Sequence, residues 1–176
     1  MKNILTAAVL LLAALSQLAQ PRQQGRSATQ TKWRVDVIEK KTVYDLQKRL
    51  RVSYSDPEEQ RAHLRDEASV QLWPAERLAT ALAKVAESGY ILIDIEGPTI
   101  ETANPRWFEA VITTEDGAEL AREKGPDVIP MNLSAHKWFS GFSVALKNKP
   151  MAPLKVFVID TVMNERVVYR LTPPGS

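Results

Sequence analysis

Short segments in which apolar and polar residues alternate recur along this chain after Lys32. Residues two apart in a strand point to the same face of its sheet, so this alternation predicts strands with one face in a core and the other toward water. Segment 90–95 is apolar except for Asp94 and predicts a central, buried strand. The alternating segments are 33–37, 50–54, 107–114, 138–146, 154–159 and 167–171.

Turn signals between these segments indicate how the strands pair. Glu115-Asp116-Gly117 predicts a reversal into residues 118–122, and residues 160–165 predict a second reversal before the last segment. Such hairpins build antiparallel sheets. The pattern favours a mainly β fold, an antiparallel β-sandwich of immunoglobulin-like or similar type, as a single globular domain over residues 32–176. The alternative is an α+β fold in which a helix covers a single sheet.

One helix is expected from about residue 74 to 88. Leu78, Leu82 and Val85 recur there at helical spacing, and Gly89 follows where a left-handed residue would end the helix. The many alanines around these residues predict that the helix packs closely against a sheet.

A second, shorter helix is expected from Pro57 to about Asp66. Asp56 can cap its first turn, and proline is favoured at the first helical position. Val70 and Leu72 then indicate a further short strand before the main helix.

The amino-terminal residues have a different character. Lys2 precedes an apolar run from Ile4 to Leu15, and small residues follow it, so residues 1–19 are expected to be a secretory signal peptide. Because the run is shorter than the ~20 residues of a membrane-spanning helix, cleavage is favoured over the alternative of an uncleaved membrane anchor. Residues 20–31 are expected to form a disordered polar spacer. This pattern predicts a periplasmic or extracellular protein with no membrane span after cleavage.

Composition excludes several classes of function. The chain of 176 residues has 23 basic and 21 acidic residues, and this near balance argues against a nucleic-acid partner. It contains no cysteine, which excludes disulfides, thiolate metal ligands and a cysteine nucleophile. Neither common glycine-rich phosphate loop occurs, and no cofactor is expected. His63 and Glu67 could lie one helical turn apart, but a metal site needs at least a third ligand.

Three residues are candidates for catalysis. Asp94 and Glu96 would share one face of a strand, and a buried pair of acids could do acid–base work on a glycosidic bond. The simpler interpretation is that the strand leaves the core there and both acids meet water or a cation. His136, close to Ser134, could belong to a catalytic triad, although no glycine-flanked elbow marks the serine as a nucleophile.

Two tryptophans are candidates for ligand binding. Trp33 and Trp138 share the parity of expected core residues, whereas periodicity leaves Trp73 and Trp107 unplaced. If Trp73 and Trp107 were exposed on one surface, they could bind a sugar or a protein partner.

Basic residues concentrate in one segment between residues 40 and 51. Such charge indicates a strand edge protected against edge-to-edge pairing, or a surface for an anionic envelope component. The basic residues are Lys40, Lys41, Lys48, Arg49 and Arg51, and Glu39 and Asp45 lie among them.

These signals favour an exported, non-catalytic domain that acts by binding or assembly and engages a protein or glycan partner at the cell envelope. The alternatives are a small hydrolase of envelope polysaccharide using Asp94 and Glu96, and a carbohydrate-binding module using Trp73 and Trp107. Converging carboxylates in a concave pocket would favour the hydrolase, and coplanar exposed indoles the carbohydrate-binding module. An open edge strand or an exposed apolar patch would favour the binding domain.

Overall fold

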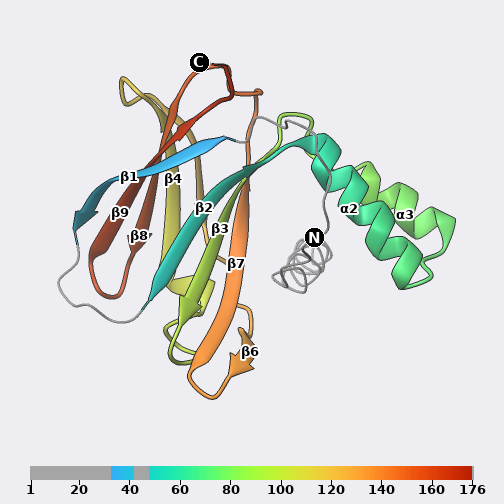
Figure 1. The fold of residues 1–176 in the computed structure, drawn as a ribbon, viewed down its shortest axis with the longest axis horizontal. Coiled ribbons are helices and arrows are strands. Elements are labelled where there is room, and N and C mark those ends of the chain that lie inside the picture. Colours follow the sequence, from blue (N-terminus) through green and yellow to red (C-terminus); the bar gives the residue numbers. More distant parts are fainter. Residues whose placement is uncertain (1–32, 42–47, 176) are drawn as a thin grey trace, which may run out of the picture.

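The computed structural model describes residues 33–41 and 48–175, and the predicted signal peptide (1–19) and spacer (20–31) lie outside them. The strands are β1 (Arg34–Lys41), β2 (Arg49–Ser55), β3 (Tyr90–Gly97), β4 (Phe108–Thr114), β5 (Glu119–Lys124), β6 (Met131–Ser134), β7 (Lys137–Ala145), β8 (Leu154–Asp160) and β9 (Glu165–Thr172). They form two antiparallel sheets that pack face to face, with the orders β1-β9-β8-β4-β5 and β2-β3-β7-β6 (Figure 1).

The mainly β sandwich expected from the alternating segments is confirmed, and the single-sheet alternative is wrong. Both predicted hairpins occur, between β4 and β5 and between β8 and β9. Strand β6 was not expected, because its four residues are exposed or half-buried and carry no alternation toward a core.

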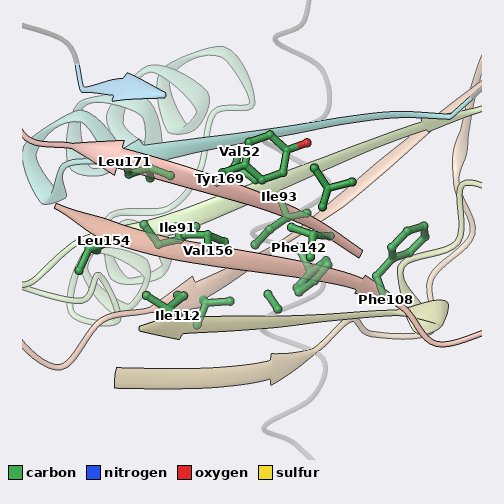
Figure 2. Packing of buried hydrophobic residues seen from close by; sticks show 14 of the residues in the cluster. Val52, Ile91, Ile93, Phe108, Ile112, Phe142, Leu154, Val156, Tyr169 and Leu171 are labelled. Atoms are coloured by element: carbon green, nitrogen blue, oxygen red, sulfur yellow. The ribbon is translucent and has the colours of Figure 1, made fainter. Parts of the chain in front are cut away.

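The core fills the space between the two sheets (Figure 2). In β3, the side chains of Ile91, Ile93 and Ile95 are fully buried, and the residues between them are half-buried on the outer face of the sheet. β3 is therefore an inner strand, as predicted, with one face in the core. The opposite sheet contributes Phe108, Ile112, Val156, Val158, Tyr169 and Leu171.

Two helices, α2 (Pro57–Val70) and α3 (Ala75–Leu82), connect β2 to β3. α2 begins where it was predicted to begin. The Asp56 side chain accepts a hydrogen bond from the Glu58 N–H at 3.0 Å, and the Glu59 carboxylate accepts one from the Asp56 N–H at 3.4 Å. This reciprocal capping pairs backbone groups that a helix start otherwise leaves open.

The end of α2 carries no recognisable sequence signal. Leu72 has a left-handed φ of 52°, and the Trp73 N–H donates to the Ala68 carbonyl at 2.9 Å. Glycine usually occupies this left-handed position after a helix, so a leucine there gives no sequence signal for the end of the helix. The short strand predicted from Val70 and Leu72 is wrong, because the former is the last residue of α2 and the latter lies in the turn.

The helix predicted over 74–88 is present as the shorter α3, and it packs on α2 rather than on a sheet. In Figure 1 the two helices form a hairpin that projects beside the sandwich from the end of β2. Val85, which extended the helical pattern in the sequence, is buried in the turn region after α3. Among the described residues, no helix is long and apolar enough to cross a membrane.

Candidate functional site

Strands β1 and β2 end their two sheets on the same side of the sandwich (Figure 1). Among the described strands each pairs on one side only, β1 with β9 and β2 with β3. Of the basic residues in segment 40–51, Lys40 and Lys41 therefore lie on one edge strand, and Arg49 and Arg51 on the other. The space between these two edges is called the edge groove below.

The edge groove is open because, among the described strands, β1 packs mainly on β9 of its own sheet rather than on a strand of the other sheet. Val35 and Val37 pair with Leu171 and Tyr169 of β9, so all four side chains point to the inner face of their sheet. Leu171 and Tyr169 are 0% and 5% exposed, whereas Val35 and Val37 are 37% and 58% exposed. The core is thus covered at β9 and uncovered at β1.

A hollow of about 890 Å³ lies in the edge groove beside the start of α2, and it is called the helix-end hollow. Its apolar walls include Trp33, Val35, Tyr54 and Met151. The Trp33 and Tyr54 rings lie 4.5 Å apart, tilted by 33°, and both pack against the core. Trp33 is therefore partly a core residue, as expected, and partly a wall of the groove.

A second hollow of about 440 Å³, called the hairpin-end hollow, lies in the edge groove beside the β8–β9 hairpin. Val37, Leu50, Phe108 and Tyr169 contribute to its apolar walls. Both hollows are lined by residues of β1 and of β2 and share no lining residue, so they are two separate hollows along the edge groove.

A buried ion pair ties the two sheets together at the hairpin end. The Lys48 Nζ lies 2.5 Å from the Asp160 Oδ2, and the two side chains are only 11% and 6% exposed. The other Asp160 oxygen accepts hydrogen bonds from the N–H groups of Val162 and Met163, at 3.0 and 2.9 Å. Asp160 thus caps the hairpin turn and neutralises a lysine from the other sheet.

A tyrosine from the first sheet reaches the edge of the second. The Tyr169 hydroxyl donates a hydrogen bond to the Leu50 carbonyl at 2.9 Å. Burial raises the pKa of Tyr169 to about 12, so the hydroxyl keeps the proton it donates at neutral pH.

The backbone of β2 presents hydrogen-bonding groups to the edge groove. In β3, the Ile93 carbonyl is directed toward Gly141 of β7, so the backbone groups of its neighbour Val52 in β2 point away from β3. Backbone groups of every second residue in a strand point the same way, so those of Leu50 and Tyr54 also point away from β3. The hydrogen bond that the Leu50 carbonyl accepts from Tyr169 agrees with this direction. An added strand could pair with β2 at Val52 and Tyr54.

The carboxylates of Asp94 and Glu96 share one face of β3, as predicted, but it is the outer face of the sheet. Glu96 forms an ion pair with Lys137 at 3.1 Å. Asp94 lies between Arg51 of β2 and Gly141 of β7. Neither acid lines the hollows of the edge groove, and the arrangement agrees with the simpler interpretation of acids that meet a cation at the surface.

The pKa of Asp94 is raised above its usual value because burial disfavours the carboxylate, and the charge of Arg51 offsets only part of that effect. A raised pKa in the folded state means that the ionised side chain reduces stability at neutral pH, and that this loss starts to shrink below the raised pKa and is gone below the ordinary pKa of the unfolded chain. We expect a carboxyl NMR titration to give a midpoint above 3.8 for Asp94. We also expect Asp94→Asn to be at least as stable as the natural chain at pH 7, with no advantage at low pH. A midpoint below 3.8 would contradict this assignment.

The other candidates lie apart from one another. Trp73 lies between α2 and α3, with the Arg77 guanidinium 3.9 Å from its ring centre. Trp107 ends the 3-10 helix η1 (Pro105–Trp107), which follows the opposite end of β3, and Arg106 lies 4.2 Å from its ring. Each indole has an arginine over one face, and the two do not form a common surface.

His136 is exposed in the turn between β6 and β7. His63 and Glu67 both lie on α2, one turn apart, as expected. Among the described residues, no group of three or more histidine and carboxylate side chains could hold a metal ion.

The apolar residues that shape the edge groove were not identified as a site from the sequence, although Lys40, Arg49 and Arg51 had been singled out as part of a basic surface. Val35 and Val37 were expected to be half-buried strand residues, and Tyr169 an ordinary core residue. Only the exposure of β1 in the folded chain distinguishes them. Comparisons with protein-family models, with curated proteins and with solved structures find no match to this chain.

Proposed function

We propose that this protein is an exported binding module that takes up one extended segment of a partner protein at the cell envelope, as an added strand along the edge groove. The observation that carries the proposal is the exposure of Val35 and Val37 on a sheet face whose other residues form the core. In strand addition, main-chain hydrogen bonds supply affinity and sites for alternate side chains supply specificity. The signal-peptide pattern of residues 1–19 supports the exported location.

The shape of the edge groove favours a single strand over a second copy of the chain. A strand added to β2 would lie opposite β1 and cover Val35 and Val37. In a symmetric pair joined through β2, the second copy would bring its own β1 over the same place. The two β1 strands would then collide, because β1 already extends past β2 in each copy.

The alternatives have less support from the geometry. Asp94 and Glu96 lie outside the hollows, and Trp73 and Trp107 lie at opposite ends of the second sheet. Binding in the edge groove is the function for which apolar walls, backbone groups and open volume coincide.

A library of random nine-residue peptides displayed on phage tests this proposal. We expect the natural chain to enrich peptides with alternating apolar residues. Val37→Lys should weaken their binding by about tenfold or more, because it places a charge where apolar surface would be buried. Val37 is already exposed, so the substitution should leave the fold intact.

Val162→Lys is the matched control. Val162 is 60% exposed, close to the 58% of Val37, but it lies in the β8–β9 turn outside the walls of both hollows. Enriched peptides should bind the Val162→Lys variant as they bind the natural chain. Failure to enrich any peptide, or equal weakening by both substitutions, would refute the proposal.

A further inference from the structure

The two ends of the edge groove carry opposite charge. Three carboxylates and one ammonium group line the helix-end hollow, a formal charge of −2, from Asp56, Glu58, Glu59 and Lys149. Among the residues of the hairpin-end hollow, those that can face an added strand carry a formal charge of +2, from Lys40, Lys48, Arg49, Arg51, Asp160 and Glu165. Arg49 and Arg51 alternate with Val52 and pair with Glu96 and Asp94, so they would flank the outer face of the added strand. Arg166 points to the outer face of the first sheet, because it alternates with Val167 and Tyr169.

Ion pairs within the protein neutralise only part of the negative charge at the helix-end hollow. Lys149 pairs with Asp56 at 3.2 Å, and Arg61 of α2 pairs with Glu58 at 2.5 Å. Within the described residues no ion pair engages Glu59, whose carboxylate accepts the long bond from the Asp56 N–H. The local field is negative: the pKa of Tyr54 is raised, first by burial and then by the charges of Asp56 and Glu59.

The positive charge at the hairpin-end hollow is likewise only partly neutralised by ion pairs. Lys48 is neutralised by Asp160, and Arg166 forms an ion pair with Glu39. Lys40 and Arg49 make no ion pair within residues 33–41 and 48–175. Lys40 is paired with Val167 of β9, so it belongs to the inner face, toward the groove.

We infer that the partner segment has basic residues at its amino-terminal end and acidic residues at its carboxyl-terminal end. This inference rests on the proposed function. β2 runs from Arg49 at the basic end to Ser55 at the acidic end, and every strand pair described in both sheets is antiparallel. An antiparallel added strand therefore starts at the acidic end and finishes at the basic end. The opposite polarity would place like charges together and be rejected.

Two synthetic peptides of identical composition test the inference. One has the sequence KKVTVTVEE, the other has the reversed charge order EEVTVTVKK, and both have blocked termini. Fluorescence titration of the full chain should show about tenfold or tighter binding of the first peptide, because several exposed charge pairs each contribute a modest attraction. The preference should shrink when salt is raised from about 0.05 M to about 0.5 M.

Two charge-reversal variants complete the experiment. Lys40→Glu should remove most of the preference, whereas Lys124→Glu, an exposed lysine of β5 at the far edge of its sheet, should retain it. Equal affinity for both peptides, or equal effects of the two variants, would overturn the charge polarity. If the charge polarity is overturned but Val37→Lys still weakens the binding of library peptides, the proposal of strand addition in the edge groove stands. Absence of binding by KKVTVTVEE while such library peptides bind would also overturn the polarity.

Discussion

Asp160→Ala is expected to lower the free energy of unfolding by about 3–5 kcal/mol, the usual cost of removing one partner of a buried ion pair. The substitution leaves the Lys48 ammonium group in a site where it is 11% exposed, with no carboxylate at 2.5 Å. It also removes the acceptor of the Val162 and Met163 N–H bonds in the β8–β9 turn. Urea unfolding followed by circular dichroism should show a lower midpoint with an unchanged slope.

A double-substitution cycle separates the ion pair from the turn cap. Asp160→Asn keeps an oxygen acceptor for the turn but leaves the lysine charge unpaired. Lys48→Met removes that charge while retaining much of the side-chain volume. We expect the combined variant to recover most of the stability lost by Asp160→Asn, because replacing a whole buried ion pair is far less costly than breaking it. Additive losses in the combined variant would contradict a direct interaction between the two side chains.

Phe142→Ala is expected to lower the free energy of unfolding by about 3–5 kcal/mol through loss of buried apolar surface and formation of a cavity. Phe142 lies on β7, is 2% exposed, and is among the largest side chains fully enclosed by the two sheets (Figure 2). The loss should appear in the same urea experiment, and the cavity should not be relieved easily because backbone ladders hold β7 on both sides.

Phe139→Ala provides the control on the same strand. Phe139 is half-buried on the outer face of β7, where it pairs with Glu96. Because less apolar area is removed from water there, its loss should cost at most about 1.5 kcal/mol. Similar losses for Phe139→Ala and Phe142→Ala would contradict the assignment of the inner face of β7 to the core.

Local patterns were sufficient for most of the strands and for the start of the first helix. The alternation around Phe108, Ala110 and Ile112 identified β4 because a strand with one buried face must repeat every second residue. Asp56 and Pro57 identified the start of α2 because capping chemistry is local. The end of α2 was missed because Leu72 occupies a left-handed position that glycine normally marks.

The candidate site was much less predictable. Asp94 and Glu96 were correctly placed on one face of a strand, but alternation alone does not say which face of a sheet is enclosed. Val35 and Val37 show the converse error: their pattern is that of a strand with one buried face, and yet they are 37% and 58% exposed. Both outcomes depend on which strand of the other sheet lies opposite.

The sequence by itself determined the period of the strands, their hairpins and the charge on the segment of residues 40–51, because these properties depend on neighbours along the chain. The tertiary structure alone decided that β1 and β2 become the edges of different sheets, that β1 leaves Val37 largely exposed, and that Lys48 meets Asp160 across the interior. These contacts join residues distant along the chain. The edge groove therefore exists only after the two sheets have packed.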